Sequence, residues 1–220
     1  MPKWVPDTDL PAAVTFVSFA LGVALGRFAA DGGGIVDEAP PTALPHGLLF
    51  LSAGSRTDSL DHSACAGLRA AWAEHGGAVK RGAELRDWLR LEFFKHHRTL
   101  YENRPIWLPL SSAKRNFVVF AAIHRWHDGT LDEVRVLLKD ERKRRDGELE
   151  DVKHARATGD AKTRGAEEKR QEDLRALLAE LDGFAAKVEA VSEQGAPPAP
   201  GGKPRNADAR FAMDLDDGDR

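Results

Sequence analysis

A regular spacing of apolar residues in the last third of the chain constrains the fold more than any other feature of the sequence. Apolar side chains recur there at three- and four-residue intervals, at Leu174, Leu177, Leu178, Leu181, Phe184, Val188 and Val191. Such heptad-like spacing forms one apolar stripe along a helix, and that stripe requires a partner surface. The charged stretch after Thr130 carries a weaker stripe, at Val134, Leu137, Leu138, Leu149 and Val152. The two stripes predict an antiparallel helical hairpin, with helices at about Thr130–Thr158 and Arg164–Ser192.

A second constraint is the uncharged run from Leu10 to Gly26 near the N-terminus. Its length lies at the lower limit of the roughly 17–25 residues that a bilayer-spanning helix needs. A signal peptide begins with net positive charge, whereas Asp7 and Asp9 offset Lys3 here. We therefore predict a helix at 11–28 that is apolar all round and buried, with a membrane anchor as the alternative.

The central section predicts a basic helix followed by two short strands. Glu84–Tyr101 has apolar residues at helical spacing and a second face rich in Arg, Lys and His. Ile106–Leu110 and Phe117–Ile123 are short runs of apolar, mainly β-branched and aromatic residues, separated by the polar and basic segment Ser111–Asn116. This pattern favours a β-hairpin, with a strand followed by a buried helix as the alternative. The apolar run His46–Ser52 is a third candidate strand.

Together these elements predict an α+β fold that is predominantly helical. A small hairpin or mini-sheet packs on helices and is followed by the long helical hairpin and a flexible tail. We expect a mixed α/β region at 1–128, with the basic helix and hairpin at 84–127 as its DNA-facing part. The charged helical hairpin then occupies 129–193, and a flexible Pro/Gly-rich tail occupies 194–220.

The charge of the chain is unevenly distributed. The formal net charge is -3, yet the section from Lys80 to His127 holds ten Lys or Arg against four Asp or Glu. A basic section within an acidic chain is typical of polyanion binding, and solvated helix faces are the alternative. Lys and Arg neutralise phosphates, while Ser, Asn and Arg also contact bases. The candidate DNA-contacting residues are Lys95, His97, Arg98, Arg104, Ser111, Ser112, Lys114, Arg115 and Asn116.

The motifs of common enzymes and metal sites are missing from the sequence. Cys65 is the single cysteine, so no disulfide can form within the chain and nothing indicates an oxidising compartment. His124 and His127 have helical spacing but lack the further ligands that a structural zinc requires. Neither Pro-Pro pair follows the Asn or Asp that amino-group methyltransferases use to hold a flipped base. We expect no catalytic residue and no metal site in this chain.

Two blocks of the sequence resemble a known family. FVSFALGVALGRF at Phe16–Phe28 and LRDWLRLEFFKHHRTLYENRPIWLPLSSAKRNFVVFAAIHRWHDGTLDEVR at Leu85–Arg135 are similar to the region after the catalytic domain in BREX-type and type II-like adenine-specific DNA methyltransferases. The terminal DLDDG at Asp214–Gly218 also fits the order of that family. In the family this region is the target-recognition part that contacts double-stranded DNA.

The resemblance implies a non-catalytic, DNA-contacting specificity portion of a site-specific adenine methyltransferase, serving phage defence or restriction–modification in the cytoplasm. S-adenosylmethionine is then expected only in a catalytic domain outside this sequence, which points to a split or truncated gene product working with a separately encoded catalytic subunit. The alternative is a helical scaffold that binds protein partners without DNA, motivated by an exposed apolar stripe over Leu174–Val191.

Overall fold

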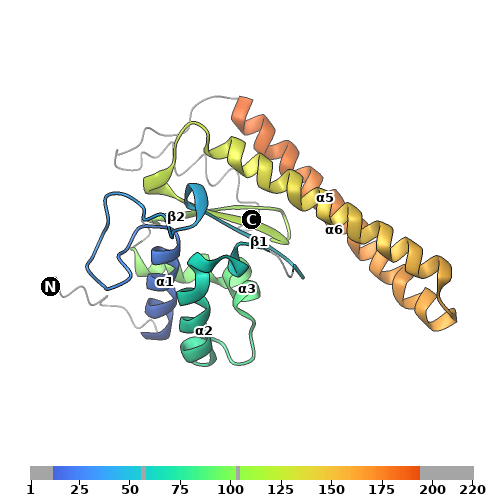
Figure 1. Cartoon of the computed structure of the whole chain (residues 1–220), viewed down its shortest axis with the longest axis horizontal. Helices are drawn as coiled ribbons and strands as arrows, with labels where there is room; N and C mark the ends of the chain where they lie inside the picture. Colours follow the sequence, from blue (N-terminus) through green and yellow to red (C-terminus); the bar gives the residue numbers. More distant parts are fainter. Residues whose placement is uncertain (1–11, 56–57, 103–104, 194–220) are drawn as a thin grey trace.

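The computed structural model describes residues 12–55, 58–102 and 105–193, and there the chain is mostly helical around one small sheet (Figure 1). The sheet lies between two helical layers. Short helices cover one of its faces, and the proximal part of the long helical pair covers the other. The α+β, predominantly helical fold predicted from the sequence is confirmed. The tail predicted at 194–220 lies outside the described residues.

The sheet has three antiparallel strands in the order β1-β3-β2: β1 Leu48–Ser52, β2 Trp107–Ser111 and β3 Phe117–Ala122. In the central strand β3, Val119 pairs with Phe50 of β1 and with Leu110 of β2. All of β3 is buried because both faces of the sheet are covered, which explains its continuous apolar sequence. The predicted hairpin is confirmed, and the alternative of a strand followed by a buried helix is wrong.

The layer of short helices forms the larger core. It contains α1 Ala12–Ala24, α2 Ala66–Val79, α3 Leu85–Trp88, the π-helical turn η4 Leu89–Phe93 and α4 Phe94–Leu100. Short 3-10 turns connect the elements: η1 Pro45–Gly47, η2 Ser59–Asp61, η3 Ser63–Cys65 and η5 Ile123–Arg125. Large aromatic side chains of this layer and the sheet pack together, among them Trp88, Phe93, Trp107 and Phe120. The helix predicted at 84–101 therefore exists, with a π-helical turn inside it.

The N-terminal helix α1 is shorter and less covered than its sequence suggests. It ends at Ala24, and nearby Gly26 has a φ of +72°, a conformation that disfavours other residues. One side of α1 packs in the core, while Phe16 is 52% exposed and Phe19 is 36% exposed on the other. The prediction of a buried helix at 11–28 is therefore corrected in its end, which lies at Ala24, and in the cover of Phe16 and Phe19. Within the described ranges, no helix is both long enough and apolar enough to cross a membrane.

The long helices α5 Thr130–Thr158 and α6 Ala161–Glu193 form an antiparallel pair, which we call the arm. The arm confirms the helical hairpin predicted from the two stripes. Its helix α6 begins at Ala161 rather than Arg164, because Asp160 caps it by accepting a hydrogen bond from the Thr163 amide at 2.8 Å.

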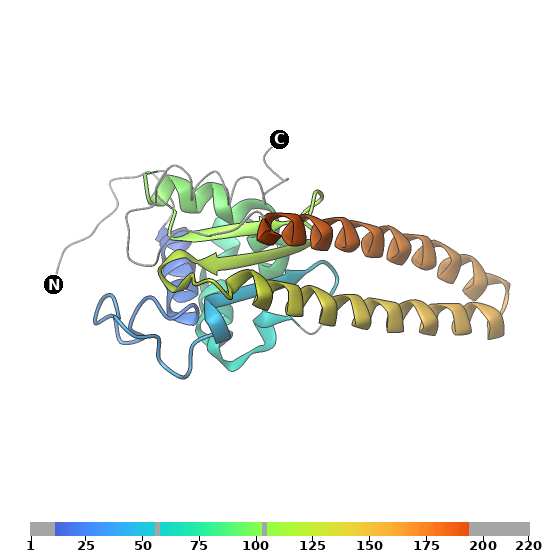
Figure 2. The ribbon, with the colours of Figure 1, turned by 90° about the horizontal axis from the view of Figure 1, so that it is seen from above.

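The arm has two halves with different surroundings. The proximal half shares a core with the sheet, in which Phe184 and Val188 lie with Phe50 and Val119. The distal half projects from the body as two helices side by side (Figure 2). Its interior is a small separate cluster of Leu149, Val152, Leu174 and Leu178. The boundary predicted at residue 129 therefore lies within a shared core rather than between independent units.

Candidate nucleic-acid interface

The β2–β3 turn, residues 112–116, is a tight and internally bonded loop. The Arg115 amide donates to the Ser112 carbonyl at 2.8 Å, and the Ser112 amide donates to the Phe117 carbonyl at 3.0 Å. Arg115 has a φ of 55°, which lies in the left-handed region that costs a non-glycine residue conformational energy. The surrounding contacts must therefore hold this turn in place.

Glu180 of α6 supplies much of that support. Its carboxylate accepts hydrogen bonds from the Ser112 hydroxyl, from the Lys114 amide at 3.0 Å and from the Asn116 side-chain amide at 2.6 Å. The hydroxyls of Ser111 and Ser112 are buried, and the amide of Asn116 is already engaged. The predicted DNA contacts of Ser111 and Ser112 are therefore corrected, because their side chains are buried, whereas the contact predicted for half-buried Asn116 stays a prediction. Lys114 remains exposed at the tip of the turn.

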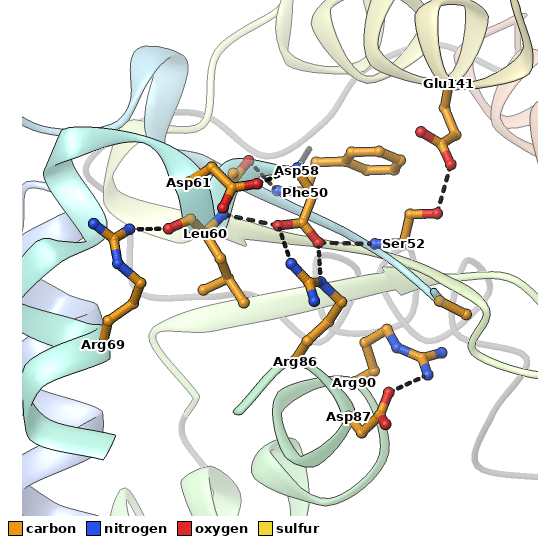
Figure 3. Close-up of polar contacts among 12 residues, drawn as sticks. Phe50, Ser52, Asp58, Leu60, Asp61, Arg69, Arg86, Asp87, Arg90 and Glu141 are labelled. Carbon is orange, nitrogen blue, oxygen red and sulfur yellow. Dashed lines mark hydrogen bonds and ion pairs between the residues drawn. The ribbon is translucent and has the colours of Figure 1, made fainter. Parts of the chain in front are cut away.

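The opposite side of the turn is held by Arg90 from the π-helical turn η4. Arg90 is 7% exposed and donates to the Arg115 carbonyl. It also donates to the Asp87 carboxylate at 2.8 Å (Figure 3). A π-helical turn contains an extra residue, which changes the direction of its side chains relative to a regular helix. The turn is therefore fixed between α6 and η4, and half-buried Arg115 is part of this arrangement.

His97 belongs to the core rather than to the basic surface. Its Nε2 accepts from the Ile106 amide at 3.1 Å, and its ring lies 4.6 Å from that of Tyr101. Burial lowers the pKa of His97 to about 3, so the ring is neutral at physiological pH. The prediction that His97 contacts DNA is corrected, because its side chain has no exposed surface.

Three predicted cations remain on the surface of the described chain: Lys95 and Arg98 on α4, and Lys114 in the turn. They form two groups at opposite ends of β2, because α4 ends beside the start of that strand and the turn follows its end. A five-residue strand is about 17 Å long, which equals about five base pairs of duplex. The separation of the two groups is therefore shorter than one turn of duplex DNA. Arg104 lies outside the described residues.

The end of β1 carries a buried polar cluster that the sequence did not indicate as a site. The Ser52 hydroxyl donates to Glu141 of α5 at 2.5 Å and accepts from Arg145 at 2.7 Å (Figure 3 shows the first contact). Glu141 and Arg145 are each 3% exposed and form an ion pair at 2.8 Å. Ser52 lines neither the cleft between His46 and Val136 nor the cleft beside His124 and Arg125. The cluster therefore fastens α5 to the sheet, and we assign it no chemistry.

A second ionic contact supports the loop after β1. The Asp58 carboxylate accepts from Arg86 at 2.5 Å and from the Leu60 amide at 3.0 Å (Figure 3). This hydrogen bond raises the pKa of Arg86, so the guanidinium stays charged. The Asp58 side chain is fully buried, and Arg86 on the predicted basic face is thereby neutralised.

The histidines considered as metal ligands border a polar cleft of about 530 Å³ near Arg125. His124 is half-buried, and desolvation lowers its pKa to about 4, while His127 is exposed. Within the part of the chain that the structure describes, no group of three or more His, Cys, Asp or Glu is placed to hold a metal ion.

No protein-family model and no curated protein matches this chain.

Replacing Glu180 by Ala tests the assignment of this residue to the turn. The substitution removes a charged acceptor from four donors, so we expect the free energy of unfolding to fall by about 1.5–3 kcal/mol. Hydrogen exchange of the Lys114 amide should also accelerate. Glu189→Ala is the matched control on the same helix, because Glu189 is half-exposed and its ion pair with Arg135 lies at the surface; its cost should stay below about 1 kcal/mol. Equal costs for the two variants would show that Glu180 does not hold the turn.

Proposed function

We propose that this chain is a non-catalytic, DNA-contacting specificity portion of an adenine-specific DNA methyltransferase system. It acts in the cytoplasm, on double-stranded DNA, in phage defence or restriction–modification. A separate catalytic subunit that binds S-adenosylmethionine supplies the methyl transfer, and this chain supplies contacts to the target.

The observation that carries the proposal is the placement of Lys95, Arg98 and Lys114. These exposed cations lie at the two ends of β2, and both of their supporting elements are anchored by buried contacts. Rigid support reduces the entropy that a side chain loses on binding, which favours phosphate contacts at fixed positions. Both groups fall within the block Leu85–Arg135 that resembles the target-recognition region of these methyltransferases.

The alternative, a protein-binding scaffold, was motivated by an exposed apolar stripe on the last helix, and the structure does not have one there. The apolar stripe over Leu174–Val191 is not exposed: Leu181 is 1% exposed, Phe184 3% and Val188 0%, because α5 and the sheet cover them. A partner helix would have to displace the chain's own core to use this stripe.

Binding of the purified chain to duplex DNA across a salt series tests the proposal. Each phosphate contact contributes about 0.9 to the slope of log affinity against log salt concentration. We expect salt-dependent binding, and a slope lower by about 2–3 in Lys95→Ala/Arg98→Ala/Lys114→Ala than in the unsubstituted chain.

The control for this experiment is a variant with three exposed cations of the arm removed: Lys139→Ala/Lys143→Ala/Arg175→Ala. None of these three forms an ion pair with another described residue, so their removal should not disturb the fold. The slope of log affinity against log salt concentration should be nearly the same for this control as for the unsubstituted chain. A folded chain that fails to bind duplex at low salt would exclude autonomous DNA binding, and equal slopes in the two variants would exclude the assigned residues.

A further inference from the structure

The arm has a fixed base. Glu141 and Arg145 attach α5 to the end of β1, and Glu180 attaches α6 to the β2–β3 turn, which lies at the same end of the sheet. The backbone carbonyl of Asn116 also accepts a hydrogen bond from the Ala53 amide at 2.7 Å, so the two attachment points are joined. The distal half therefore extends from the body in a set direction (Figures 1 and 2).

The distal half also holds together by itself. Arg156 of α5 donates to Glu168 at 3.0 Å and to Gln171 at 2.9 Å, both on α6. These contacts lie beyond the small cluster around Val152 and Leu174, so the two helices are joined close to the connecting turn. The connecting turn at Gly159 is thus the end of a stiff two-helix rod.

The surface of the distal half offers no apolar site. The large apolar residues that are exposed in the described chain lie elsewhere: Phe16, Phe19, Ile35, Leu91 and Val136. A partner of this half must therefore be recognised through charge and hydrogen bonds rather than through apolar burial.

The end of the arm differs in charge from the rest of it. Residues 153–165 hold four Lys or Arg, one His and a single Asp, whereas 130–152 and 166–193 together hold ten Lys or Arg against sixteen Asp or Glu. Lys162 and Arg164 are exposed, and neither forms an ion pair with another described residue. The Asp160 carboxylate accepts a hydrogen bond from the Thr163 amide, and this bond lowers the pKa of Asp160. The arm is an acidic rod with a cationic tip.

We propose that this tip, residues 153–165, is a second contact for the phosphate backbone of the duplex that the body binds; the inference rests on the proposed function. The 19 residues from Glu180 back to Ala161 place the tip about 28 Å from the turn that carries Lys114. A ligand that contacts both must carry negative charge along this whole length, which corresponds to about eight base pairs of duplex. Duplex DNA meets this requirement, whereas a short acidic peptide does not. The acidic remainder of the arm would keep the intervening helices away from the phosphates.

Duplex length separates this inference from the proposed function. A hairpin duplex with a stem of about six base pairs is about 20 Å long, which is enough for the two cation groups of the body but too short to reach from the turn to the tip, whereas a duplex of about 25 base pairs spans them. We expect Lys162→Glu/Arg164→Glu to bind the long duplex about tenfold or more weakly than the unsubstituted chain, and the short duplex with nearly unchanged affinity.

The matched control is Lys139→Glu/Lys143→Glu, which reverses two exposed charges of α5 near the body. It should change the affinity for the long duplex less than the tip variant does. Circular dichroism should show full helix content in both variants, because all four side chains are exposed.

Four results would overturn the inference. If the chain binds both duplexes and the tip variant weakens neither, the body alone contacts DNA and the proposed function stands. If the tip variant lowers the affinity for both duplexes equally, the tip acts through the net charge of the chain and not through direct contact with the far end of the long duplex. If the unsubstituted chain binds neither duplex, the proposed function and the inference fail together. Displacement of the long duplex by polyglutamate at equal charge concentration would show that the tip accepts any polyanion, which also contradicts a duplex-spanning contact.

Discussion

Glu141→Ala is expected to lower the free energy of unfolding by about 3 kcal/mol, the lower end of the range for breaking a buried ion pair. The substitution removes the acceptor of the Ser52 hydroxyl and leaves the Arg145 guanidinium buried with Glu148 as its remaining ionic partner at 2.9 Å. The larger part of this cost comes from a buried guanidinium that is left with one ionic partner instead of two. Urea unfolding followed by tryptophan fluorescence measures the change, since Trp107 and Trp126 lie near the sheet.

A double variant shows whether Glu141→Ala lowers stability because it leaves a buried charge or because it leaves a cavity. Glu141→Leu/Arg145→Met removes both charges and fills the site with apolar side chains, so it should recover most of the stability that Glu141→Ala loses. Asp146→Ala, which removes an exposed partner of Arg142, should cost less than about 1 kcal/mol. A Glu141→Ala cost as small as that of Asp146→Ala would mean that the buried pair does not fasten the arm to the sheet.

The helices of the arm could be predicted because their pattern is local. A helical stripe depends on residues three and four apart, so Leu174 to Val191 specified α6 without knowledge of its partner. The weaker stripe of α5 also indicates the buried ion pair between Glu141 and Arg145. Glu141 and Arg145 occupy stripe positions between Leu138 and Leu149, and charges at positions that should be apolar indicate a buried polar contact.

The partners of those charges could not be predicted. Ser52 lies 89 residues before Glu141, and the β2–β3 turn lies 66 residues before Glu180. Residue types show that Ser112 and Asn116 can bond phosphate or base, but only the fold shows that a carboxylate from α6 takes those bonds. The sequence therefore predicted the turn between the two strands, but not which of its side chains remain exposed.

The helical spacing around His97 predicts that its side chain lies on the buried face of the helix rather than on the basic face. It follows Phe93 by four residues and precedes Leu100 by three, so a helix places all three on one side. Both neighbours are buried, and so is His97. The basic residues around it, Lys95 and Arg98, lie on the exposed side, as the same spacing requires.

The burial of His97 makes stability depend on pH. Its pKa is about 3 in the folded chain, against about 6.5 in an unfolded one. Below pH 6.5 the unfolded state therefore binds more protons, and stability is fully present above that pH and is lost as the pH falls toward 3. Between pH 7 and pH 5 this single group should lower the free energy of unfolding by about 2 kcal/mol. The pKa of His124 is lowered in the same direction and adds to the loss.

His97→Gln isolates this contribution, because Gln does not titrate and its side-chain oxygen can still accept from the Ile106 amide. We expect the unsubstituted chain to lose about 2 kcal/mol more stability from pH 7 to pH 5 than the variant does. Equal losses would show that His97 is not the responsible group. If the variant is too unstable for this comparison, the ring proton signals of His97 in the unsubstituted chain give the answer directly. A ring that stays neutral at pH 5 in the folded protein follows from burial among Tyr101, Phe93 and Trp107, and a ring that titrates near pH 6.5 would place His97 on the surface after all.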